Sequence, residues 1–167
     1  MLFQFVSWLA SFPSSLALRE SIWVYPVIES VHVLTLTVFV GTSVLWDLRL
    51  LGVLLCGVSV SEAQRRFMPV MTGGFVVMVI SGIVLFYGDP VRFYLNIFFR
   101  IKAVFLVLAA ANAYVFHQSA AGRDLTTWHV APRTPRTAKV AAVASLVLWA
   151  GIITAGRMIA YNWFNPK

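Results

Sequence analysis

Residues 21–46 form a long apolar stretch that contains a single charged residue, Glu29. Twenty-six residues of α-helix measure about 39 Å, and the hydrocarbon core of a bilayer is about 30 Å thick. The stretch therefore predicts a membrane-spanning helix, with Glu29 and His32 both inside the bilayer. Ionisable groups at that depth usually face the protein interior and indicate a functional site.

The composition of the whole chain supports a membrane location. Of 167 residues, 60% are hydrophobic and 11% are charged, and the mean hydropathy is +0.84. This excludes an ordinary soluble domain and predicts an integral membrane protein that contacts the lipid bilayer. The net charge of +7 does not predict a nucleic-acid partner, because the Lys and Arg residues are scattered between apolar runs. The single cysteine, Cys56, excludes an internal disulfide.

Charge-poor windows predict four membrane spans, at residues 22–46, 67–88, 97–118 and 140–163. We expect one all-α domain over residues 21–163, an antiparallel four-helix transmembrane bundle. Residues 1–20 precede it and carry several aromatic residues, which predicts a short helix at the membrane interface. The connections 47–67 and 118–139 hold seven Lys and Arg residues, against six elsewhere. The positive-inside rule therefore places both termini outside the cytoplasm.

Depth along the predicted helices brings several polar groups to one level. Counted from the outer face at about 1.5 Å per residue, Glu29 lies about 10 Å deep, Lys102 about 8 Å and Arg157 about 9 Å. A buried Glu29–Arg157 or Glu29–Lys102 ion pair is therefore predicted, since an isolated charge is costly there. The alternatives are a proton or anion site, or a carboxylate that orients His32.

His32 is the candidate haem ligand. It lies about 15 Å deep, level with Met78 on the second span, and His with Met is a known axial pair for haem iron. Met78 is otherwise ordinary core. His117 lies about 15 Å further along the bundle, whereas two imidazoles on one iron place their nitrogens about 4 Å apart. His117 instead caps its helix end or meets Met68, Met71 or His129.

Three sequence motifs carry a family resemblance. They are Trp23-Val24-Tyr25-Pro26 followed by Glu29-x-x-His32, then Asp47-Leu48-Arg49-Leu50-Leu51-Gly52, and late in the chain Gly156-Arg157-x-Ile159-Ala160-Tyr161. Together with Asn112 and Phe116-His117 they resemble an uncharacterised family of bacterial four-span inner-membrane proteins, over roughly residues 20–162. The resemblance implies a multi-pass protein of the bacterial inner membrane. It groups Glu29, His32, Asp47, Arg49, His117 and Arg157 into one constellation, with Asp47 and Arg49 as a polar cluster at the membrane interface.

More distantly, the layout is similar to four-helix b-type membrane cytochromes and to copper-export-type membrane domains. The chain has three histidines, which does not fit two haems per chain. The first functional hypothesis is a redox module that binds haem b and passes electrons between a quinone and a membrane protein partner. His32, Met78, His117 and Arg157 are its candidate cofactor contacts, and Arg157 or Arg100 would pair with the propionates.

Two other functions remain open. The chain is alternatively a cofactor-free accessory or structural subunit of a larger membrane complex, in which buried charges hold helices together. A small transporter is the third hypothesis, and four spans would require a homo-oligomer to form a gated path. No P-loop, nucleophile elbow or zinc-peptidase motif is present, so no enzyme class is predicted and no catalytic residue is assigned.

Overall fold

The computed structural model of the protein describes residues 1–119 and 134–161, and all regular structure within these ranges is helical. The long helices are α3 (Val24–Leu51), α4 (Val60–Gly88), α6 (Ile97–Gln118) and α8 (Arg136–Met158). Each is long and apolar enough to cross a membrane. The short helices are α1 (Leu2–Ala10), α2 (Pro13–Glu20) and α5 (Pro90–Leu95). The prediction of an all-α four-span bundle is confirmed.

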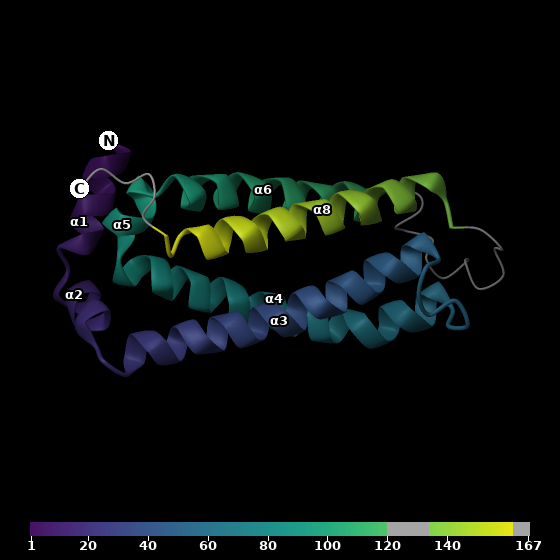
Figure 1. The fold of residues 1–167 in the computed structure, drawn as a ribbon, viewed down its shortest axis with the longest axis horizontal. Coiled ribbons are helices and arrows are strands. Elements are labelled where there is room, and N and C mark those ends of the chain that lie inside the picture. The colour runs from purple at the N-terminus through teal and green to yellow at the C-terminus, as the bar shows by residue number, and fades with distance from the viewer. Residues whose placement is uncertain (120–133, 162–167) are drawn as a thin grey trace.

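The bundle consists of two antiparallel helix pairs, α3 with α4 and α6 with α8, and the pairs meet mainly where α3 packs against α8 (Figure 1). The short helices α1, α2 and α5 gather at one end, together with the start of α3 and the end of α8 (Figure 1). We call this the terminal end. The opposite end, where residues 52–59 connect α3 to α4, is called the turn end.

The helices α3, α4 and α8 extend past the predicted spans at the turn end. The first helix continues to Leu51, where Gly52 ends it in the left-handed conformation with a φ of 74°. Helix α4 begins at Val60, capped by the Ser59 hydroxyl, which accepts a hydrogen bond from the Glu62 backbone N–H at 3.2 Å. Hydropathy finds the apolar part of a span and misses these polar turns, because they carry charges.

The N-terminal segment forms two helices where one was expected. Phe12 has an extended backbone (φ −68°, ψ 133°) and Pro13 opens α2, so the chain bends between them. Ser15 of α2 donates a hydrogen bond to the Tyr87 carbonyl of α4 at 2.7 Å. Phe5 and Trp8 of α1 are more than half exposed, which suits a helix at the membrane interface.

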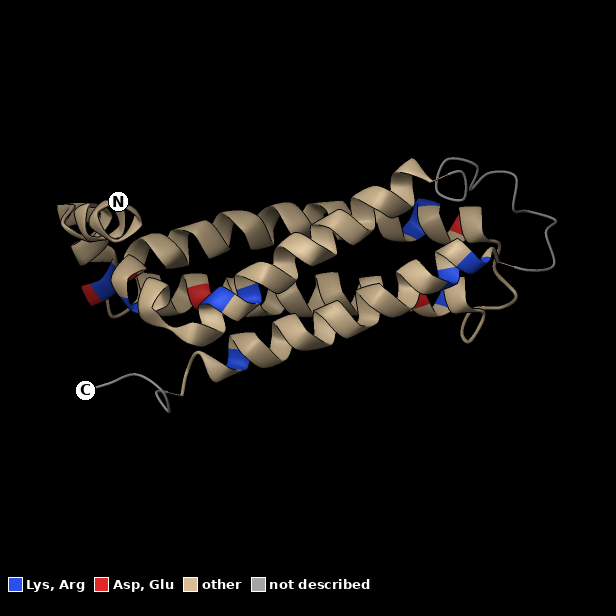
Figure 2. Cartoon of the chain, turned by 90° about the horizontal axis from the view of Figure 1, so that it is seen from above, with Lys and Arg blue, Asp and Glu red and all other residues tan. Residues whose placement is uncertain are grey.

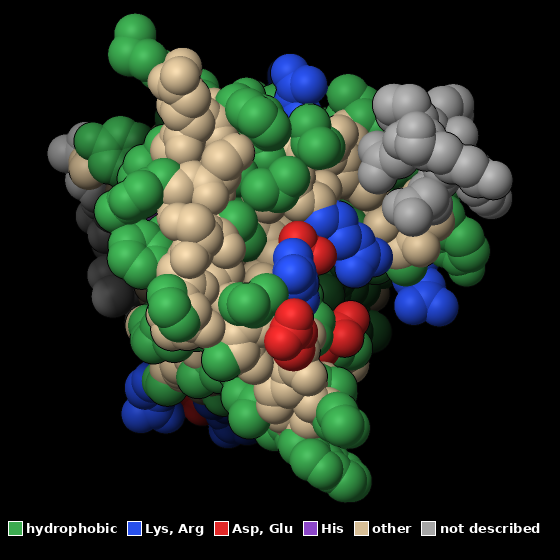
Figure 3. Space-filling view, turned by 90° about the vertical axis from the view of Figure 1, so that its left-hand side faces the viewer, with side chains coloured by type: hydrophobic (Ala, Val, Ile, Leu, Met, Phe, Trp, Pro, Cys, Tyr) green, Lys and Arg blue, Asp and Glu red, His purple; other side chains and the backbone are tan. Residues whose placement is uncertain are grey.

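Charged residues lie toward the two ends of the long helices and leave a wide central band without any (Figure 2). Viewed from the terminal end, acidic and basic side chains sit together among hydrophobic ones (Figure 3). This distribution is the one expected for helices that cross a bilayer.

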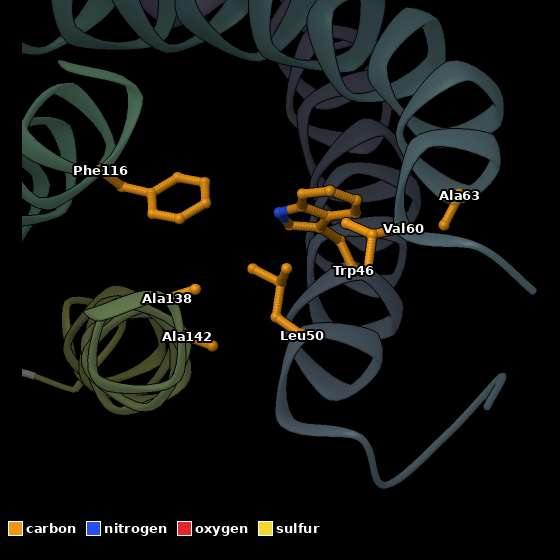
Figure 4. Close-up of a cluster of buried hydrophobic side chains, with 7 residues drawn as sticks. All are labelled: Trp46, Leu50, Val60, Ala63, Phe116, Ala138 and Ala142. Atoms are coloured by element: carbon orange, nitrogen blue, oxygen red, sulfur yellow. The ribbon is translucent and has the colours of Figure 1, made fainter. Parts of the chain in front are cut away.

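Two clusters of buried side chains hold the bundle together. The first, at the turn end, joins all four long helices, and in Figure 4 Leu50 lies opposite Ala138 and Ala142 while the Trp46 and Phe116 side chains point toward each other. Alanines on α8 allow α3 to approach closely there. The second cluster lies further along the bundle and contains Phe39, Val40, Met78, Trp149 and Ile152. These two clusters therefore close the bundle at the turn end and in its middle.

Candidate functional site

His32 binds the neighbouring helix α4 through its side chain. Its Nδ1 lies 2.8 Å from the Oγ of Ser81, a residue only 6% exposed. The ring also lies against Gly82, where an added Cβ would be 3.3 Å from Cε1 of the imidazole. Any larger side chain at Gly82 would crowd the ring, so this glycine fixes how closely His32 approaches α4.

The hydrogen bonds of Ser81 indicate which ring nitrogen of His32 carries the proton. Its hydroxyl donates to the Val77 carbonyl oxygen at 2.7 Å, and the Met78 carbonyl oxygen lies further from the hydroxyl, at 3.2 Å. A hydroxyl has one proton to give, so when Ser81 donates it to the Val77 carbonyl it can only accept from His32, whose Nδ1 then carries the proton. In that arrangement Nε2 of His32 carries no proton and keeps its lone pair. This is the form in which a histidine binds a metal.

Lys102 of α6 approaches the same region from the opposite helix pair. Its side chain is partly buried, and its Nζ lies 3.7 Å from the position that a Cβ on Gly156 of α8 would take. Lys102 therefore packs beside Gly156 within the α6–α8 pair. We call His32, Ser81 and Gly82 the His32 site, which α3 and α4 form together, whereas Lys102 and Gly156 belong to the other helix pair.

Glu29 does not form the predicted ion pairs in the structure. Its side chain is exposed, and the ion pairs of the described residues are those of Glu62 with Arg65 and Arg66. Arg157 is also exposed, because it follows buried Ala155 by two residues, a rotation of about 200° around the helix. The predicted depths gave the level of Glu29 and Arg157 along their helices. They did not give the direction of each side chain around its helix, and Arg157 turns away from the interior.

Met78 lies at the same level of the bundle as His32, but its side chain belongs to the second core cluster. It is 6% exposed and packs with Phe39 and Trp149, whose rings are 5.0 Å apart in an edge-to-face arrangement. Met78 is therefore part of the hydrophobic core. Its role as a haem ligand remains a prediction.

His117 is separate from the His32 site. It is exposed near the end of α6, and its Nδ1 lies 2.7 Å from the Ala113 carbonyl one turn earlier. Fifteen residues separate it from Lys102, about 22 Å along the helix. The alternative partner His129 lies outside the described residues.

Asp47 and Arg49 do not form the polar cluster predicted for them. Asp47 is 4% exposed and faces the interior, whereas Nε of Arg49 donates to the Val58 carbonyl at 2.6 Å. Two residues along a helix are about 200° apart, so these side chains point to different sides. Asp47 lies four residues, about one helical turn, after Ser43, which is also 4% exposed, so both residues lie on the interior side of α3.

The fold and the His32 site define the chain as a multi-pass membrane protein with a polar site inside a four-helix bundle. A family model described as a family of unknown function (DUF6644) matches residues 20–162. The chain belongs to this family. Comparisons with curated proteins and with solved structures give no match.

Proposed function

We propose that the protein is a membrane redox module in which His32 holds a b-type haem and electrons pass between a quinone and a partner protein. The observation that carries this proposal is the 2.8 Å contact between Nδ1 of His32 and Ser81. A ligating histidine usually donates its other ring N–H to a neighbouring group, which fixes its tautomer and orientation. Ser81 supplies that partner and leaves Nε2 as the free ligand atom.

The surroundings of His32 support a cofactor between the two helix pairs. Glu29 and Asp47 lie on the same side of α3, because eighteen residues make five full turns. Asp47 is 4% exposed and Glu29 is exposed, so the interior side of α3 is covered at the turn end and uncovered near His32. We place the haem against this uncovered side.

Lys102 would pair with a haem propionate in this arrangement, because it is a partly buried cation on α6, in the helix pair opposite α3 and α4. Met78 would have to leave the second core cluster to reach the iron. The proposal therefore requires His32 alone as a ligand from the described residues. When bound, the haem supplies the one-electron chemistry, and the protein sets its orientation and exposure.

The test is the absorption spectrum of the detergent-purified full chain, expressed with added haem. We expect a reduced-minus-oxidised difference spectrum of the b type, lost in His32→Ala. His117→Ala is the matched control, since this exposed histidine lies outside the site, and it should keep the spectrum. A colourless wild-type protein, or equal spectra from His32→Ala and wild type, would contradict the proposal.

A second candidate function, a cofactor-free subunit of a larger membrane complex, is favoured by exposed charges at membrane depth. The side chains of Glu29 and Arg157 are both exposed within their own chain, and an uncovered charge in lipid is costly. A partner subunit that covers Glu29 would remove this cost.

Cross-linking in native membranes tests the subunit hypothesis. The variant Glu29→Cys, in a Cys56→Ser background, should give a cross-linked product of higher mass. A cysteine at Val107, which is 69% exposed on α6, is the control and should give none. Equal cross-linking yields at positions 29 and 107 would show that no partner subunit covers Glu29.

A further inference from the structure

Asp47 has a buried carboxyl group at the turn end of the bundle. The residue is 4% exposed, and within the described part of the chain its Oδ2 has no hydrogen-bond partner. The side-chain interaction that the carboxyl does make is with the hydroxyl of Ser145 on α8. A buried polar atom without a partner is rare in native structures and calls for an explanation.

The neighbours of Asp47 exclude water from it. Trp46 and Leu50 of α3 are 7% and 1% exposed, and Ala142, one turn before Ser145 on α8, is 1% exposed. The carboxyl therefore borders the first core cluster, with hydroxyls as its polar neighbours. An ionised carboxylate in such surroundings is far more costly than a neutral acid that lacks one hydrogen bond.

No described cation offsets a negative charge at Asp47. On its own helix, Arg49 is bound to the Val58 carbonyl. On α4, Glu62 pairs with Arg65 and Arg66, which are 79% and 70% exposed. The other charged or titratable groups of the described turn end are exposed, namely Cys56 of the α3–α4 connection, Tyr114 and His117 of α6, and Arg136 and Lys139 of α8. The nearby C-terminal end of α3 adds a partial negative charge of its own.

We infer that Asp47 is a proton-binding site inside the membrane domain, occupied at neutral pH. A metal cation is a poorer fit, because hard cations take about six oxygen ligands. This level of the bundle offers one carboxyl with the hydroxyls of Ser43 and Ser145, and the described residues contain no cluster of three metal-ligating side chains. The site is independent of the haem proposal, since Asp47 lies fifteen residues from His32, about 22 Å along α3.

Infrared spectroscopy of the full chain in lipid vesicles tests this inference. At neutral pH the wild type should show the C=O stretch of a protonated carboxylic acid, and this band should move in deuterated water. Asp47→Asn should lose the band. Glu62→Gln is the control, because its carboxylate is paired with two arginines, and it should keep the band.

Three results would overturn the proton site. The first is a wild type without this band, and the second is an Asp47→Asn variant that keeps it. The third is loss of the band when sodium replaces potassium at constant pH, which would identify a sodium site. If Asp47→Asn does not fold, Ser145→Ala serves as the second variant. Loss of the hydroxyl should shift the frequency of the band, and an unchanged frequency would assign the band to another carboxyl group.

Discussion

At the scale of single residues, the hydrogen bond between His32 and Ser81 does two things. It joins α3 to α4, where such interhelical bonds contribute about 0.6 kcal/mol in membrane proteins. It also presents Nε2 of His32 for a ligand. The residue pattern predicted His32 as the functional histidine, whereas its partner Ser81 could not be predicted, because serines within spans commonly bond their own helix, as Ser81 also does with Val77.

Ser81→Ala separates these two roles. We expect the variant to fold and to bind haem about 10–100-fold more weakly, the usual effect of removing a group that orients a metal ligand. The measurement is a haem titration of the purified apoprotein, followed by absorbance. Ser81→Thr keeps a hydroxyl and should retain most of the affinity, while equal affinity in Ser81→Ala would show that the bond does not position the ligand.

At the scale of helices, α6 and α8 form a pair whose spacing depends on one glycine. An added Cβ at Gly151 of α8 would lie 2.7 Å from the ring of Phe105 on α6. In the same pair, Asn112 donates to the Ala141 carbonyl at 3.0 Å. A large side chain at Gly151 would force both contacts apart, because a well-packed interface has no spare volume.

Gly151→Leu should therefore lower stability by about 1–3 kcal/mol, the usual cost of overpacking. Thermal unfolding in detergent, followed by circular dichroism, measures the change. Gly73→Leu is the matched control, because an added Cβ there meets nothing within 4 Å. Similar melting of Gly151→Leu and wild type would contradict the packing described for α6 and α8.

At the scale of the whole molecule, the sequence predicted the spans and the heights of polar groups, but not which way those groups face. Hydropathy finds spans because the bilayer requires apolar stretches of a fixed length. Glu29 and Asp47 lie on the same side of α3, yet one is exposed and the other buried. That difference depends on where α8 packs against α3, which the two core clusters place at the turn end and in the middle of the bundle, a tertiary property that one helix does not encode.

Membrane orientation is the prediction that belongs to this scale. The excess of basic residues at the turn end predicts that this end faces the cytoplasm. Cys56, the single cysteine, is exposed in the α3–α4 connection and serves as a natural probe. A membrane-impermeant thiol reagent should label it in inverted vesicles and not in intact cells. Labelling in intact cells would reverse the assigned orientation.

The central claim is that His32 is a haem ligand, and pulsed electron paramagnetic resonance of the ferric protein tests it most directly. Cells grown with ¹⁵N-labelled histidine would supply the labelled chain. We predict an axial imidazole nitrogen coupling that changes with the label, is absent in His32→Ala and persists in His117→Ala. A spectrum without a histidine coupling, or a coupling that survives in His32→Ala, would contradict the account.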